Sequence, residues 1–419
     1  MKRLLRNLDQ LPTTQITVIA ILFIVMRFVV LFFFTSNGPL NVYTDVSFYF
    51  HTAQYSDLGY YPFVNMWYEY PPIPAYLVQF TYDLATTFFA IPDVFSLEYQ
   101  LWTRLLGVAL LVFDVGVLLL IHKIVRKAWD LKRADWVAAI YALSSLPLFY
   151  FAFGHGIIMV FFTLLTIERY LEGKQTESAI ALGLAIASKL TPLFMLVPIV
   201  RFLWEEKDQR IVRVIKYSAI TVGTVTLFYL PFILMGSGAW VLASFEALAV
   251  KGSWSTVWAL IDGNWIVNYG RLPDLIQLDQ ATVARMKPPV FPELVKTAIF
   301  FVGFGWFYIK PLRDKSAKSF VMYAALTSIV FHLWAKGWSP QWSTLIVSML
   351  LIAFPSKRGF LILMLLTSIT FLEWPIADAI ASHGLLAFTI ISRTVLFCFV
   401  AYWLAKAISN PQQVVESQQ

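Results

Sequence analysis

The chain has 419 residues, of which 59% are hydrophobic and 14% are charged. Soluble globular proteins carry about 25% charged residues, so this composition excludes an ordinary soluble enzyme; apolar runs of about 20 residues recur and indicate a polytopic membrane protein. The net charge of +7 comes largely from the connections between these runs, which explains it without a nucleic-acid partner. The single cysteine, Cys398, excludes an intrachain disulfide.

Hydropathy predicts an all-α polytopic membrane protein with about 12 transmembrane segments. The first apolar run is too long for a signal peptide and no small-residue cleavage site follows it, so we interpret it as a retained span. The expected segments are 15–34, 101–122, 135–153, 156–171, 178–188, 190–204, 212–235, 294–312, 319–336, 341–355, 360–374 and 385–405.

The positions of Lys and Arg predict the orientation in the membrane. With the N-terminus inside, most of the 32 Lys and Arg fall in cytoplasmic connections, as the positive-inside rule requires. Both termini are then cytoplasmic, and the two large loops, 35–100 and 236–293, face outward. We expect one membrane-embedded domain, 1–409, and a polar tail, 410–419. In a prokaryote the membrane would be the cell membrane.

Two apolar stretches depart from simple spans. If 72–91 crossed the membrane, the basic connection 123–133 would lie outside, so we expect an interfacial or re-entrant helix on the outer face. The short segments 178–188 and 190–204 are separated by "SKLTP", in which a Lys and a Pro interrupt the apolar pattern. Short helices that meet at a polar break resemble the broken helices that line sites in transporters.

Motif searches exclude several chemistries. The sequence has no phosphate-binding glycine loop, no HExxH, no Cys pair and no GxSxG, and its five His are scattered. We therefore expect no cofactor, and no pattern supports a divalent metal. Charged residues that the topology places toward the outer face could line one cavity. They are Arg27, Asp45, Asp57, Glu69, Arg104, Asp114, Lys189, Lys336 and Arg393.

Carboxylates together with cations suit an anionic substrate that reacts beside a carboxylate base. Asp45 in "YTDVSFYF" is a candidate base or the start of a helix. Glu69 in "YEYPP" either orients a reacting group or is a helix-dipole carboxylate. Lys189 is a candidate phosphate ligand, with a side chain that snorkels to the membrane interface as the alternative. The same two roles are open for Lys336.

Structural roles are favoured for two other charged residues. Arg27 and Asp114 lie deeper in their spans, and we expect them to form a structural ion pair.

Four stretches, in chain order between residues 43 and 342, carry a resemblance to a known family. They are "YTDVSFYFHTAQYSDLGYYPF", "YEYPPIPAYL", "LGLAIASKLTPLFMLVP" and "KGWSPQW". They resemble the first outer loop, the "EYPPL" stretch, the K-x-x-P break and the "SPQ" stretch of the glycosyltransferase-C superfamily of integral membrane enzymes. Within it they are most similar to the polyprenol-phosphate-mannose-dependent mannosyltransferases, which include the glycosylphosphatidylinositol mannosyltransferase.

The resemblance implies a glycosyltransferase that moves a sugar, expected to be mannose, from a polyprenyl-phosphate donor to a lipid or glycan acceptor at the outer face. It implies inversion at the anomeric carbon, with Asp45 as general base. From its position in "YEYPP", Glu69 is expected to be a second catalytic residue. By charge, Arg104, Lys189 and Lys336 would hold the donor phosphate.

Four further residues are expected to bind substrate, and two positions depart from the family pattern. The expected substrate-binding residues are Tyr43, Tyr70, His155 and Gln341. Ser47 stands where some relatives have a second acid, which weakens the case for a metal. His155 lies in "GHGI", where many relatives carry Gln and Asp, which puts the acceptor chemistry in doubt. The alternatives are a transporter or lipid flippase with a broken-helix site for an anion, and a non-catalytic scaffold.

Overall fold

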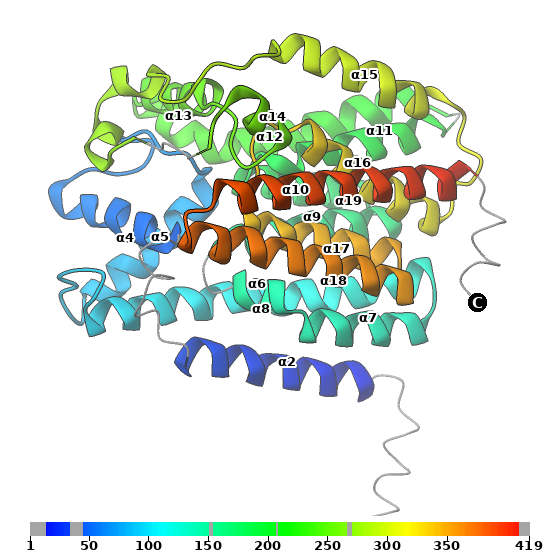
Figure 1. The fold of residues 1–419 in the computed structure, drawn as a ribbon, viewed down its shortest axis with the longest axis horizontal. Coiled ribbons are helices and arrows are strands. Elements are labelled where there is room, and N and C mark those ends of the chain that lie inside the picture. Colours follow the sequence, from blue (N-terminus) through cyan, green and yellow to red (C-terminus); the bar gives the residue numbers. More distant parts are fainter. Residues whose placement is uncertain (1–13, 34–44, 151–153, 207, 266–269, 410–419) are drawn as a thin grey trace, which may run out of the picture.

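The computed structural model describes residues 14–33, 45–150, 154–206, 208–265 and 270–409. These residues are almost entirely helical and contain no β-strand. Figure 1 shows the longer helices running side by side as one bundle. They are α2 (Thr14–Phe33), α6 (Leu97–Ala128), α7 (Leu131–Leu143), α8 (Ser145–Tyr150), α9 (Gly156–Leu171), α10 (Gln175–Ser188), α11 (Leu196–Trp204), α12 (Arg210–Leu234), α15 (Glu293–Ile309), α16 (Ala317–Trp334), α17 (Ser343–Ala353), α18 (Lys357–Phe371) and α19 (His383–Ser409).

Within the described residues, six helices are long and apolar enough to cross a bilayer: α2, α6, α12, α16, α18 with its continuation, and α19. The prediction of an all-α integral membrane protein is confirmed, while the number of spans stays a prediction. Only 17% of the spanning window of α2 and of α12 is buried, so their apolar side chains face outward, as lipid contact requires. All residues of α17 are buried, so this helix forms the centre of the bundle.

Shorter helices gather at one end of the bundle, which we call the cavity end (Figure 1). In the first long connection these are α4 (Asp45–Gln54), η1 (Tyr55–Leu58) and α5 (Pro72–Thr86). In the second they are α13 (Gly238–Val250), α14 (Val257–Asp262), η3 (Leu272–Ile276) and η4 (Leu278–Thr282). The two connections contact each other directly, since Trp67 donates its indole N–H to the carbonyl oxygen of Asp274 at 2.9 Å.

Within the segment 72–91, residues Pro72–Thr86 form one helix, α5, of 15 residues. At 1.5 Å per residue this helix is about 22 Å long, which is short of the roughly 30 Å hydrocarbon core. The prediction that it does not cross as a full span is consistent with this length. Pro71 and Pro72 explain where it begins, because proline is tolerated only in the first turn of a helix.

Two expected segments are interrupted. The expected span 135–153 is divided into α7 and α8, because Ser144 is extended and Pro147 can be accommodated only in the first turn of a new helix; residues 151–153 lie outside the described part. At "SKLTP" the break is present as expected: α10 ends at Ser188, Lys189 is extended, and η2 (Thr191–Met195) leads into α11.

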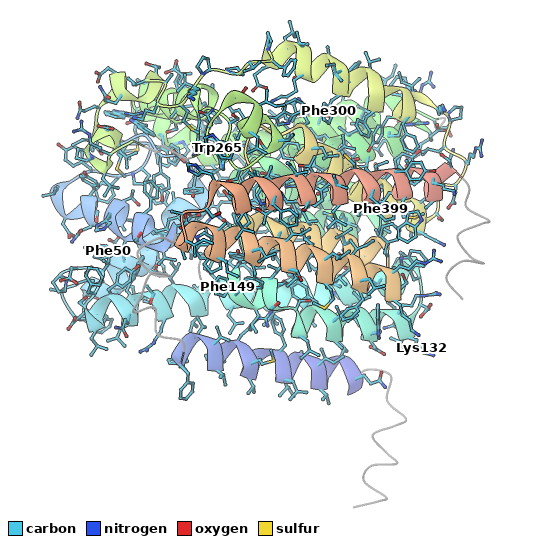
Figure 2. All side chains as sticks on the ribbon, viewed as in Figure 1. Phe50, Lys132, Phe149, Trp265, Phe300 and Phe399 are labelled. Carbon is cyan, nitrogen blue, oxygen red and sulfur yellow. The ribbon has the colours of Figure 1, made fainter. Side chains whose placement is uncertain are left out.

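The basic connection 123–133, which joins α6 to α7, lies far from the cavity end. Figure 2 shows Phe50 of α4 at the cavity end and Lys132, in the first turn of α7, at the opposite end. The beginning of α2 and the end of α19 also lie at that opposite end (Figure 1). The basic connection and the cavity end therefore lie at opposite ends of the bundle. Their placement on opposite sides of the membrane, with the basic side cytoplasmic, stays a prediction from charge.

Candidate active site

A cavity of about 490 Å³ opens at the cavity end. Its wall combines aromatic and aliphatic side chains with an unusual number of charges for a membrane protein. The charged lining residues are Asp45, Glu69, Glu293, Lys189, Lys251, Lys296 and Lys336. Charges close to a bilayer are costly unless they pair or serve a function, so their convergence on one cavity identifies it as the candidate site.

Asp45 is the first residue of α4, where the helix dipole favours a carboxylate. Three donors hold one of its oxygens, Oδ2: the Gln341 amide at 2.7 Å, the Tyr70 hydroxyl at 3.2 Å and the Tyr49 hydroxyl at 3.3 Å. Within the described residues, Oδ1 accepts no hydrogen bond from a side chain. This arrangement fixes the direction of the carboxylate and leaves one oxygen able to accept a proton.

The environment of Asp45 also changes its acidity. Burial raises the pKa of Asp45 above its ordinary value of 3.8, and the positive charge of Lys189 and the hydrogen bonds from Tyr70 and Tyr49 offset part of that rise. A carboxylate with a raised pKa is a stronger base than an exposed one, which suits proton abstraction from a hydroxyl.

Lys189 lines the same cavity. Its Nζ lies 4.5 Å from the ring centroid of Trp342, and it is close enough to Asp45 to lower the pKa of that carboxyl group. No carboxylate lies within 4.0 Å of Lys189 in the described part of the chain. Its extended backbone between α10 and η2 places it at the wall. This placement favours a ligand role over snorkelling.

The "KGWSPQW" stretch contributes a second wall. Lys336 donates to the carbonyl oxygen of Ala249 at 2.9 Å and lines the cavity together with Gln341. The Gly337 backbone pairs with Trp254 of the second connection. A Cβ on this glycine would lie 2.2 Å from the Trp254 ring, so only glycine allows this close approach.

Glu69 lines the cavity but is already engaged. It forms an ion pair with Lys251 at 2.9 Å, and both side chains are largely buried, with exposed fractions of 15% and 10%. Glu69 therefore has a specific charged partner in the second connection, and this pair replaces its interpretation as a helix-dipole carboxylate. Sequence reasoning missed Lys251 and Lys296 because it did not consider the charges of the outer loop 236–293 or those at the start of the expected span 294–312. For Lys251, its position in that loop close to Trp254 was the available signal.

His155 lies behind the cavity wall rather than in it. Its ring stacks on Tyr49, with centroids 4.6 Å apart, and meets the edge of Tyr70 at 4.4 Å. It is 3% exposed, and neither ring nitrogen has a hydrogen-bond partner in the described residues. The expected role in substrate binding does not fit this position, because two tyrosines that hold Asp45 separate His155 from the cavity.

Several expected residues do not reach the cavity. Arg104 approaches the carbonyl oxygen of Phe32 at 3.5 Å and is not part of the cavity lining, so its expected role as a phosphate ligand is not supported. Asp57 accepts a hydrogen bond from Tyr82 at 2.7 Å. Tyr43 lies outside the described residues. Of the nine charged residues expected to share one cavity, four line it: Asp45, Glu69, Lys189 and Lys336.

The remaining charged residues form structural pairs in the bundle. Arg27 donates to Asp114 at 3.0 Å and to the carbonyl oxygen of Ala142 at 3.1 Å, and Tyr141 donates to Asp114 at 2.7 Å. The expected structural pair is therefore present. Arg393 pairs with Glu373 and donates to the carbonyl oxygen of Ser255.

The described residues contain no group of three or more His, Cys, Asp or Glu that could hold a metal ion. The partners of Asp45 are all hydrogen-bond donors, whereas a metal site would need further acceptor oxygens or nitrogens beside it.

The described residues thus define an integral membrane protein with a charged, partly apolar cavity at one end of its helical bundle. In sequence the chain is 26% identical over 191 residues to GPI mannosyltransferase 1 of Saccharomyces cerevisiae. The match covers 44% of this chain and 43% of that enzyme, so it extends over less than half of the relative's length. No protein-family model matches the chain. The expected resemblance to a mannosyltransferase is confirmed as similarity over this segment.

Solved structures of glycosyltransferases show a distant likeness. ArnT from Cupriavidus metallidurans, bound to undecaprenyl phosphate, matches 92% of this chain and 76% of its own at 12% identity, with a TM-score of 0.49. The oligosaccharyltransferase of Archaeoglobus fulgidus in its apo form matches 95% of this chain and 56% of its own at 12% identity, with a TM-score of 0.45. Such low scores do not transfer the details of those sites to this chain.

Proposed function

We propose that this protein is a glycosyltransferase that moves a sugar from a polyprenyl-phosphate donor to a hydroxyl of a lipid or glycan acceptor, with Asp45 as the general base. The observation that carries the proposal is the state of Asp45: one oxygen is held by three donors, and the residue lines a cavity that also presents Lys189. The similarity to a yeast mannosyltransferase supports the class of reaction and makes mannose the first sugar to test.

The proposed reaction is a single displacement. The acceptor oxygen attacks the anomeric carbon and forms the new glycosidic bond, while the bond from that carbon to the phosphate oxygen breaks and the configuration inverts. Asp45 takes the proton of the acceptor hydroxyl on Oδ1. Gln341, Tyr70 and Tyr49 keep the carboxylate oriented through Oδ2.

The leaving group is a polyprenyl phosphate, which departs as a monoester. Because its second pKa is near 6, it leaves without an acid catalyst. Lys189 would stabilise the charge that develops on the phosphate, since cations in a partly desolvated site act strongly on growing negative charge. Lys336 would contribute from the opposite wall.

The apolar part of the cavity suits the lipid portion of the donor. Leu190, Leu193, Phe331 and Trp334 line it, and Leu193 is 54% exposed. An isoprenoid chain could therefore pass from lipid along this wall while its phosphate reaches Lys189. The beginning of α2, the end of α19 and the basic connection all lie at the opposite end, which supports an active site on the outer face.

The test is sugar transfer in proteoliposomes that contain radiolabelled polyprenyl-phosphate mannose and a mixed lipid acceptor extract. Wild-type protein is compared with Asp45→Asn, which keeps the shape of the side chain. Transfer that depends on Asp45 supports the proposal. If the wild type transfers no sugar from a panel of polyprenyl-phosphate sugars and instead scrambles labelled lipid, the transferase proposal is wrong and the flippase alternative holds.

A further inference from the structure

The Glu69–Lys251 ion pair crosses the cavity wall between the two long connections. Glu69 precedes α5 and Lys251 follows α13, so 182 residues of chain separate the partners. Their charged atoms are 2.9 Å apart, both residues line the cavity, and the Lys251 ammonium also lies 4.7 Å from the ring centroid of Trp254. The pair therefore lies within the space that the proposed function assigns to a phosphate.

Lys251 lies close to Lys189 and Lys336, two lysines for which the described residues provide no carboxylate contact. It is near enough to Asp45 and to Lys336 to lower the pKa of both groups. Lys296, by contrast, is paired with Glu293 at 2.6 Å and is packed between Trp258 and Trp334. Of the lysines on this wall, Lys251 is thus the one that combines a carboxylate partner with proximity to the candidate base.

We propose that Lys251 is a ligand of the donor phosphate and that Glu69 is the counter-ion of Lys251 before the donor binds. The phosphate displaces Glu69 from Lys251 on binding. The inference rests on the proposed function, because it takes a phosphate ester as the ligand. A largely buried lysine without a partner is costly, so Glu69 stabilises the unliganded protein. The incoming phosphate offers more oxygens and more charge, and Lys251 exchanges one anion for the other.

This exchange assigns Glu69 a role opposite to that of a catalytic residue. A counter-ion competes with substrate, so its removal strengthens phosphate binding. A residue that orients the acceptor or the base would lower turnover when removed and leave phosphate binding unchanged. As the sugar leaves, the phosphate gains negative charge, and a Lys251 already released from Glu69 stabilises that charge together with Lys189.

The experiment measures binding of a short-chain polyprenyl monophosphate, without sugar, to the full-length protein in nanodiscs. Lys251→Met should weaken binding about 10-fold, as expected for a charge-assisted contact of about 1.5 kcal/mol. Glu69→Gln should tighten binding several-fold. The double variant should bind like Lys251→Met, because Glu69 acts only through Lys251.

Glu293→Gln is the matched control, since it frees Lys296 in the same cavity by the same change of charge. It should alter affinity less than Glu69→Gln does; equal tightening would assign the effect to net charge and overturn the exchange. Weaker or unchanged binding by Glu69→Gln, with transfer lost, would also overturn it and return Glu69 to catalysis. Lys251→Arg and thermal melting of each variant separate a ligand effect from misfolding.

The two levels of proposal fail differently. If the wild type neither binds polyprenyl monophosphate nor transfers sugar, the proposed function is wrong. If the wild type binds it and all variants bind equally well, only the role of Lys251 and Glu69 is wrong.

Discussion

Two carboxylates near cations, Asp114 in the bundle and Asp45 at the cavity, differ in how their oxygens are hydrogen-bonded. In the bundle, Asp114 is fully buried and both its oxygens accept hydrogen bonds, one from Arg27 and one from Tyr141. At the cavity, the described residues place side-chain donors on one oxygen of Asp45 only, and Lys189, which lines the same cavity, forms no contact ion pair with any of them. Each oxygen of Asp114 thus has a donor without any ligand, whereas Asp45 keeps one oxygen without a side-chain donor in this part of the chain.

The comparison teaches how to separate structural from functional charge in a membrane protein. A buried pair that satisfies its hydrogen-bonding groups stabilises one packing of helices and has little capacity left for chemistry. A carboxylate and a lysine that share a cavity without contact leave space between them for a substrate. The same rule assigns Arg393 and Glu373 to structure, since they pair directly and neither lines the cavity. The Glu69–Lys251 pair differs from them, because both of its residues line the cavity.

The largest expected effect is that of Asp45→Asn on turnover. Removal of a general base typically costs about 10²- to 10⁴-fold in rate, and we expect kcat for sugar transfer to fall within this range. The Asn side chain can still accept the hydrogen bond from Gln341, so binding of polyprenyl phosphate and the melting temperature should stay near wild type. Equal loss of turnover and of phosphate binding would contradict the division of roles between Asp45 and Lys189.

Substitution in the structural Arg27–Asp114 pair should lower stability rather than the rate of sugar transfer. Arg27→Met leaves Asp114 buried without its cation, which we expect to cost about 3–5 kcal/mol of unfolding free energy. Thermal melting in detergent measures this loss, and a double variant, Arg27→Met with Asp114→Leu, should recover part of it. If Arg27→Met abolished transfer at unchanged stability, the pair would belong to the site and the comparison would fail.

Lys189→Met should reduce kcat/KM for the donor by about 10- to 100-fold, the worth of a hydrogen bond to a charged group. It should also move the pH profile. Transfer requires ionised Asp45, so activity falls as the pH drops through the raised pKa of this residue; Lys189 lowers that pKa, and its removal raises it further. The acid limb of kcat/KM should therefore shift to higher pH in Lys189→Met, and an unshifted limb would argue that another group is the base.

His155 allows a smaller test of the same site. We expect His155→Phe, which keeps a ring against Tyr49 and Tyr70, to retain transfer within a few-fold, and His155→Ala to lower kcat about 10-fold with an unchanged KM for the donor. The reason is that the ring supports the two tyrosines that hold Asp45. If Phe and Ala were equally harmful, the imidazole itself would be required, as in the sequence-based expectation of substrate binding.

The sequence predicted the helical class, a separate helix at α5 and the break at Lys189, because these features depend on local hydropathy, length and proline. It also predicted that Asp45, Lys189 and Gln341 belong together, and the cavity unites them. It could not predict the partner of Glu69, since a contact across 182 residues depends on how two loops fold over each other. It separated Arg27 and Asp114 as a structural pair, but it could not predict that Asp57, Arg104 and Arg393 do not line the cavity, because depth in the membrane does not reveal which side of a helix faces the cavity.

Arg104 shows this limit most clearly and supplies the smallest expected effect. Its position near the beginning of α6 suggested a phosphate ligand. Its guanidinium instead approaches the Phe32 carbonyl and ring on the neighbouring α2. We expect Arg104→Gln to change kcat/KM by no more than about 2-fold, the usual range for a substitution outside a site, about 0.5 kcal/mol. A loss as large as that of Lys189→Met would mean that the cavity extends to α6 when donor binds. Arg104 would then belong to the functional charges of the site, and the contrast between structural and functional charges would have to be redrawn on the α6 side of the bundle.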